Sequence, residues 1–135
     1  MPTIIIGIFL ILHGLVHLLY TGQSRRLFEL KPDMTWPDRS WVFSRFLGNE
    51  VAQLVVSVLL VLVTLGFIAS GLGLFIKQDW WRLAAAGSAV LSTAVFVLSW
   101  NGEFQALDDQ GGIGILINLA ILGIVLFVQI GQVVQ

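Results

Sequence analysis

Long apolar stretches alternate with short polar ones along this chain of 135 residues. Four of the apolar stretches are continuous enough to predict helices, at about residues 3–20, 50–76, 80–100 and 113–134. Each approaches or exceeds the roughly 20 apolar residues, with a range of about 17–25, that a helix needs to cross a bilayer. The pattern therefore predicts an all-α integral membrane protein: a single domain over residues 1–135 that forms a four-transmembrane-helix bundle.

A polar segment at 21–49 separates the first two predicted spans and contains a shorter helical pattern. Residues 22–26 are typical of a loop. Thr35, followed by Pro37 and Asp38, resembles a capping box with proline in the first turn, and Gly48 is a typical helix end. These signals predict a short helix at about 36–47. Its aromatic and arginine side chains favour an interfacial position on the membrane, and a helix packed on a partner subunit is the alternative.

The composition agrees with a membrane protein. Hydrophobic residues make up 57% of the chain and charged residues 11%, whereas soluble domains have roughly 45–50% and about 25%. The mean hydropathy is +0.92. Small residues recur on the predicted helices: Gly7 and Gly14 share one face, and Gly66 and Ser70 form another small pair. Such faces let a neighbouring helix approach closely.

Several classes of chemistry are excluded or disfavoured. The chain has no cysteine, which excludes disulfides, thiolate metal sites and cysteine nucleophiles. Its net charge of −1 gives no reason to expect nucleic acid as a partner. The sequence contains no phosphate-binding loop, no dinucleotide-binding glycine motif and no serine elbow. A non-catalytic role is therefore favoured over an enzyme.

The two ends of the predicted bundle differ in charge. Four spans would place both termini at one end, the terminal end, and the loops 21–49 and 101–112 at the other, the loop end. Lys and Arg number two at the terminal end, Lys77 and Arg82, and five at the loop end. The five are Arg25, Arg26, Lys31, Arg39 and Arg45. The positive-inside rule makes the loop end cytoplasmic. Arg82 is expected to extend along its helix toward the terminal end. Short loops and the lack of a cleavable signal favour a bacterial inner membrane.

Polar side chains inside the predicted spans gather toward the loop end. His13 and His17, the two histidines of the chain, lie one helical turn apart. At 1.5 Å per residue, they lie about 10 Å and 5 Å inside Tyr20, and Asn118 lies about 8 Å inside the start of its helix. Polar groups at such depth face the bundle interior and are functional candidates. We therefore predict a pocket near the loop end with these candidate ligand-binding residues: His13, His17, Tyr20, Glu50, Gln53, Trp100, Asn101 and Asn118.

Each group in this set has more than one interpretation. The i, i+4 spacing of His13 and His17 suits a metal ion, if carboxylates from Glu50 or from Glu103, Asp108 and Asp109 complete the ligand set. One histidine could serve as an axial haem ligand. Both could instead be structural, bonding the backbone or Asn118, or they could contact a quinone or lipid headgroup. A serine nucleophile would have to lie beside a histidine, and Ser99 is the candidate. Gln53 and Asn118 could join helices, and Glu50 could cap its helix.

These observations lead to three hypotheses for function. The leading one is an accessory subunit that packs beside protein partners or its own copies and shapes a lipid or quinone pocket at the loop end. The second is a small redox or metal-dependent membrane enzyme centred on His13 and His17. The third is an oligomeric small-molecule transporter, although the half of the bundle at the terminal end is almost wholly apolar.

In span number and size, the chain is similar to the DoxX-like family of small bacterial four-helix membrane proteins. The resemblance covers architecture and involves no motif, so no residue roles are carried over from it.

Overall fold

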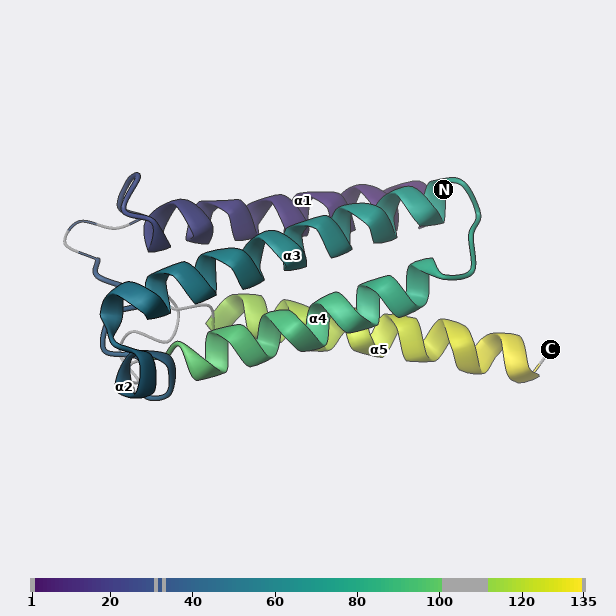
Figure 1. Cartoon of the computed structure of the whole chain (residues 1–135). Coiled ribbons are helices and arrows are strands. Elements are labelled where there is room, and N and C mark those ends of the chain that lie inside the picture. The colour runs from purple at the N-terminus through teal and green to yellow at the C-terminus, as the bar shows by residue number, and fades with distance from the viewer. Residues whose placement is uncertain (1, 31, 33, 101–111, 135) are drawn as a thin grey trace.

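The computed structural model describes residues 2–30, 32, 34–100 and 112–134, with side chains for those from 3 to 127. These residues form helices and connecting turns, with no strand among them (Figure 1). The helices are α1 (Pro2–Ser24), α2 (Phe43–Leu47), α3 (Asn49–Phe75), α4 (Trp81–Leu98) and α5 (Gly112–Val134). The chain is thus all-helical, as predicted, and both termini lie at the same end of the bundle in Figure 1.

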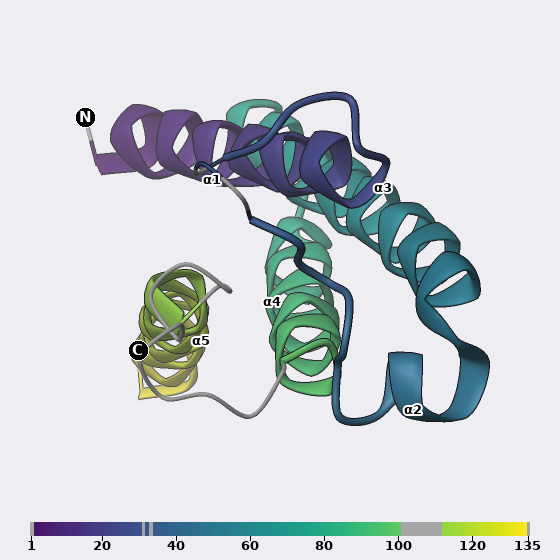
Figure 2. The same cartoon turned by 90° about the vertical axis from the view of Figure 1, so that its left-hand side faces the viewer.

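The long helices pack in the order α1, α3, α4, α5. α1 packs mainly on α3, α3 also packs on α4, and α4 packs on α5. Figure 2, viewed from the loop end, shows them in an arc with α1 and α5 facing each other across its open side. The short helix α2 lies against α3 at the loop end. The backbones of α1 and α5 therefore make few close contacts, and the contact between these two helices is made by side chains.

Among the described residues, three helices are long and apolar enough to cross a membrane: Thr3–Ser24, Asn49–Phe75 and Trp81–Leu98. They indicate a small membrane protein in a lipid bilayer. The fourth predicted span, at 113–134, falls on α5. Within α5, the apolar stretch among the residues with described side chains is Gly112–Phe127, which is shorter than these three helices.

Small residues allow α1 and α3 to approach closely. A Cβ added at Gly14 would lie 2.8 Å from Cβ of Phe67 and 3.2 Å from the carbonyl oxygen of Thr64. One added at Gly71 would lie 2.7 Å from the carbonyl oxygen of Gly7. The distances of 2.8 Å and 2.7 Å are too short for a side chain to fit without movement. The predicted close approach of a helix to the Gly7 and Gly14 face is confirmed, and the approaching helix is α3.

Two buried apolar clusters hold the four long helices together. One lies toward the terminal end and joins all four; it consists of Leu10, Val63, Phe67, Trp81, Ala85, Ala89, Ile121 and Val125. The other lies toward the loop end and consists of Trp36, Val56, Leu60, Val95 and Phe96. Trp36 comes from the connection between α1 and α2, so this connection contributes to the core as well as linking two helices.

The first helix ends later than its apolar pattern indicates. We expected the span to end near residue 20 and residues 22–26 to form a loop, but α1 continues to Ser24. Gln23 and Ser24 are fully buried. The amide of Gln23 donates to the carbonyl of Met34 at 3.0 Å, and the hydroxyl of Ser24 donates to the carbonyl of Gln53 at 2.8 Å. Polar residues extend the helix here because tertiary hydrogen bonds satisfy them.

The prediction of a helix at 36–47 is wrong for the first half of that range. Helix is present only at Phe43–Leu47, and residues 36–39 form a turn. The N–H of Arg39 donates to the Asn49 side chain at 3.0 Å, and the N–H of Trp41 donates to the carbonyl of Trp100 at 2.8 Å. These backbone groups are thus not available for helical hydrogen bonds. Gly48 ends α2 as predicted, with a φ of +83° that favours glycine.

Candidate functional site

Five polar side chains from three helices meet in the interior of the bundle. We call them the histidine network: His13 and His17 from α1, Ser92 and Thr93 from α4, and Asn118 from α5. Nε2 of His13 lies 2.8 Å from Oδ1 of Asn118, and Nε2 of His17 lies 2.7 Å from Oγ of Ser92. Asn118 and Ser92 are fully buried, and His17 is 2% exposed.

Backbone carbonyl oxygens accept hydrogen bonds but cannot donate them, and this fixes the direction of the hydrogen bonds in the network. Nδ1 of His17 lies 2.8 Å from the carbonyl of His13, so this nitrogen carries the proton. In the neutral ring Nε2 then accepts, and the hydroxyl of Ser92 donates to it. The hydroxyl of Thr93 donates to the carbonyl of Ala89 at 2.8 Å and can only accept from Asn118.

The orientation of Asn118 follows from these constraints. Its amide nitrogen donates to Ser92 at 3.0 Å and to Thr93 at 3.2 Å. Its oxygen therefore faces α1 and accepts from Nε2–H of His13. The bonds form a closed circuit that runs from His13 through Asn118, Ser92 and His17 back to the carbonyl of His13. Every donor of the circuit is used.

Aromatic rings enclose both histidines. The ring centroid of Phe67 lies 4.8 Å from that of His13 and 5.5 Å from that of His17. Phe96 lies 5.8 Å from His17 on the side of α4. Phe96 also contacts Tyr20 at 5.0 Å and Trp36 at 5.7 Å. Rings on these sides give the network an apolar environment, in which hydrogen bonds are stronger than in water.

Two pockets lie between α1 and α5, on either side of the bond between His13 and Asn118. The loop-end pocket has a volume of about 230 Å³, and the terminal-end pocket has a volume of about 270 Å³. The first is lined by His13, Val16, His17, Tyr20, Phe96, Ile113, Gly114 and Ile117. The second is wholly apolar and is lined by Ile5, Ile6, Phe9, Leu10, Trp81, Ile121, Ile124 and Val125.

The predicted site residues divide into two groups in the structure. Those that come together are His13, His17 and Asn118 in the network, with Tyr20 on the wall of the loop-end pocket. Trp100 accepts a hydrogen bond from the backbone of Trp41, outside the network. Asn101 and the loop acids Glu103, Asp108 and Asp109 lie outside the described residues.

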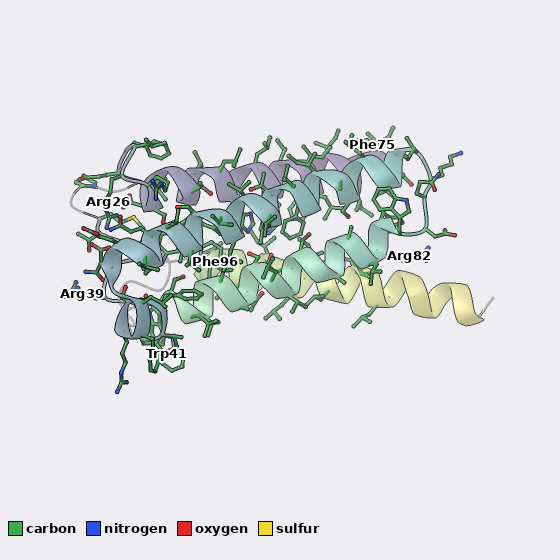
Figure 3. All side chains as sticks on the ribbon, in the orientation of Figure 1. Arg26, Arg39, Trp41, Phe75, Arg82 and Phe96 are labelled. Atoms are coloured by element: carbon green, nitrogen blue, oxygen red, sulfur yellow. The ribbon has the colours of Figure 1, made fainter. Side chains whose placement is uncertain are left out.

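Gln53 and Glu50 also lie apart from the histidines. Gln53 donates to Oδ1 of Asp38 at 2.8 Å, and Oδ2 of Asp38 pairs with Arg26 at 2.8 Å. Glu50 is exposed in the first turn of α3. Arg26 also donates to the carbonyls of Thr35 and Trp36, at 2.6 and 2.8 Å. Arg26, Asp38 and Gln53 thus form a separate cluster that holds the connection after α1, at the loop end where Figure 3 labels Arg26.

Sequence reasoning did not select Ser92, Thr93 or Phe96. Serine and threonine are common small residues on packed membrane helices, and their type carries no sign of a partner. A usable signal was position: Ser92 precedes the end of α4 by six residues, and Asn118 follows the start of α5 by six. Antiparallel neighbours therefore place the two at similar depth.

The network offers little to a metal ion or a nucleophilic reaction. Nε2 of each histidine is hydrogen-bonded, and the described residues contain no group of three or more His, Asp or Glu that could hold a metal. The serine beside a histidine is Ser92 rather than Ser99, whose hydroxyl bonds the carbonyl of Val95 in its own helix. Ser92 is fully buried and accepts a hydrogen bond from Asn118. A substrate carbonyl cannot reach its oxygen without rearrangement of the helices.

Comparison with known proteins gives no relative from which a role can be taken. No protein-family model, no curated protein and no solved structure matches the chain. The similarity to the DoxX-like family therefore rests on size and architecture alone.

Proposed function

We propose that this chain is a four-span accessory subunit of a bacterial inner-membrane complex, without catalytic activity of its own, whose loop-end pocket holds the polar end of a lipid or quinone. The observation that carries this proposal is the pocket beside the closed histidine network. The network spans α1, α4 and α5 and fixes the walls of the pocket. The fourth span is α5, and loops 21–49 and 101–112 face the cytoplasm.

The size of the pocket suits a ring or headgroup. An apolar cavity of about 150 Å³ is enough for benzene, and the loop-end pocket has about 230 Å³. Typical pockets for complete drug-sized ligands have about 300–1,000 Å³. The pocket thus accepts the head of an amphiphile while its tail remains in the bilayer. Tyr20 and Phe96 supply aromatic walls against which a flat ring can pack.

The chemistry of His13 makes the proposed ligand a hydrogen-bond donor. Its Nε2–H is used by Asn118, and Nδ1 has no hydrogen bond among the described residues. In this tautomer Nδ1 is an acceptor. A headgroup hydroxyl carries the O–H that matches it. A quinone matches it in its reduced form, the quinol, because the oxidised form carries only acceptors. His17 positions the network and makes no direct bond to the ligand.

Apolar side chains outside the spans support a partner or a membrane surface at the loop end. Leu27 and Phe46 are each 76% exposed, and Trp41 is 50% exposed. Apolar groups of this size, gathered at one end of a small protein, are typical of contact with a partner or with the interfacial region of a bilayer. We place α2 in the interfacial region of the bilayer, where it can contact both a partner protein and the membrane surface.

Native mass spectrometry of the chain, extracted gently from its own membrane, tests the accessory role. Additional polypeptides in the complex are the expected result, and their masses name the partners. A bare chain, or a multiple of it, would contradict this part of the proposal. If such a species carried a metal or haem that was lost on His13→Ala or His17→Ala, the enzyme hypothesis would replace the accessory role. A lipid or quinol lost in the same way would leave the ligand part of the proposal in place. With no adduct, the transporter hypothesis would be tested by liposome flux.

A pocket-filling substitution tests the ligand independently of the network. Ile117→Trp fills the loop-end pocket, and Leu116→Trp places the same bulk on a side chain that is 66% exposed. Both purified variants and the native chain are extracted with organic solvent, and the extracts are analysed for quinols and lipids. We expect the bound molecule to be retained with Leu116→Trp and lost with Ile117→Trp. Equal retention by both variants would rule out the pocket as its site.

A further inference from the structure

Arg82 is a cation that forms no ion pair with the described residues, at the end of the bundle opposite to the loop-end pocket. It lies in the first turn of α4, near the connection between α3 and α4 (Figure 3). Its Nε is buried and has no hydrogen-bond partner among the described residues. The guanidinium carbon lies 5.8 Å from the ring centroid of Trp81. No carboxylate of the described chain lies within ion-pair distance of it.

Arg82 lines a pocket between α4 and α5, which we call the Arg82 pocket. Its volume is about 380 Å³. Asp79 and Arg82 supply its polar groups. The other lining residues are apolar and come from both helices: Leu83, Ala86, Leu122, Val125 and Leu126. The pocket thus combines a polar end near the start of α4 with apolar walls that continue along α5.

The surroundings of Arg82 favour an anion with an apolar tail. Ionisable residues in membrane helices are usually paired, because an unpaired charge near hydrocarbon is costly. The N-terminal turn of α4 adds a positive dipole, and no side chain caps it. Guanidinium groups bind phosphate through two parallel hydrogen bonds. Leu122 and Leu126 offer an apolar surface on which an acyl chain can pack.

We propose that the Arg82 pocket binds the phosphate of an anionic phospholipid in the leaflet at the terminal end. Arg82 holds the phosphate, and the acyl chain follows the groove between α4 and α5. Asp79 opposes the binding of an anion and sets its strength, since it lies on the same pocket wall. This site shares no lining residue with the loop-end pocket, so the proposal of a lipid site at Arg82 does not depend on the proposed function.

Lipid retention by the purified full-length chain tests the proposal. The native chain and its variants are incubated in micelles with phosphatidylglycerol or phosphatidylcholine, and native mass spectrometry measures the bound fraction. The variants are Arg82→Gln and the control Lys77→Gln, which removes an exposed cation that does not line the pocket. Circular dichroism and size-exclusion chromatography establish that each variant is folded. Asp79→Asn is a second variant, which leaves Arg82 intact.

We expect the native chain to prefer phosphatidylglycerol and Arg82→Gln to weaken its binding about fivefold, from the free energy of one arginine near an anionic lipid. Lys77→Gln should retain the lipid, and Asp79→Asn should bind it more tightly. An excess of inorganic phosphate should not displace it. Equal binding of both lipids, equal losses in Arg82→Gln and Lys77→Gln, no gain in Asp79→Asn, or displacement by free phosphate would each overturn the proposal.

Discussion

His13 and Asn118 are 105 positions apart in the chain, and a 2.8 Å hydrogen bond joins the imidazole of one to the amide of the other. The bond connects α1 to α5, two helices that make little direct contact elsewhere. It also separates the two pockets between these helices. Polar side chains in an apolar interior thus contribute, with the apolar cluster that joins all four helices, to closure of the arc.

Asn118→Leu tests how much the network contributes to stability. Leucine has a similar size, but it leaves His13 and Ser92 without their shared partner. We expect a loss of about 1–2 kcal/mol in the free energy of unfolding in bicelles. Leu119→Ala is the control, at a side chain that is 54% exposed. Ser92→Ala and the double variant complete a cycle, in which the two losses should not add because both residues belong to one circuit. Additive losses would mean that the two residues act separately.

Gly14→Ala should force α1 away from α3. The added methyl would lie 2.8 Å from Cβ of Phe67, and that atom is held by the helix backbone and cannot rotate away. Overpacking of this kind costs about 1–3 kcal/mol, measurable as a lower unfolding temperature. Gly87→Ala in α4 is the matched control, since nothing lies within 4 Å of its added methyl. Similar unfolding temperatures for the two variants would show that the contact between α1 and α3 adapts.

Arg26→Gln should release the connection between α1 and α2. Arg26 donates to the carbonyls of Gln23, Thr35 and Trp36 and pairs with Asp38. We expect faster amide hydrogen exchange at Asp38 and Ser40, whose N–H groups bond within the turn that Arg26 holds. Asp38→Asn should have a smaller effect, because the carbonyl bonds of Arg26 remain. Arg45→Gln, at an exposed arginine of α2, is the control. Unchanged exchange in Arg26→Gln would contradict the role assigned to this side chain.

Trp36 should tolerate phenylalanine far better than alanine. Its ring is 2% exposed and lies 5.7 Å from that of Phe96, but its indole Nε1 is buried with no hydrogen-bond partner among the described residues. Trp36→Phe keeps an aromatic ring and removes the unpaired donor, so its cost should stay below about 1.5 kcal/mol. Trp36→Ala should cost about 3–5 kcal/mol. Equal costs in a chemical unfolding experiment would show that the indole N–H contributes through a bond absent from this structure.

The apolar pattern was sufficient to predict an all-helical membrane protein, because lipid requires every backbone group of a span to be bonded within its own helix. Depth along the helices also predicted that His13, His17 and Asn118 would lie near one another. These predictions depend on helix direction and rise alone, which sequence supplies without knowledge of which helix faces which.

Features that depend on individual tertiary bonds were not predictable. The turn at residues 36–39 exists because Arg26 and Asn49 bond backbone groups that a helix would otherwise use. The role of Ser92 depends on its rotation about α4, and many arrangements of four helices fit the same apolar pattern. Gln53 was a candidate ligand-binding residue beside the histidines, yet its partner is Asp38 in the connection before α3.

The closed circuit of hydrogen bonds has a consequence for proton transport. A Grotthuss relay requires each link to reverse its direction after a proton has passed. Nδ1–H of His17 donates to the backbone carbonyl of His13, and the hydroxyl of Thr93 donates to the carbonyl of Ala89. A carbonyl oxygen has no proton of its own to return to either donor. The two histidines therefore do not form a proton wire across the membrane, although histidine, serine and asparagine are side chains of the kind from which such wires are built.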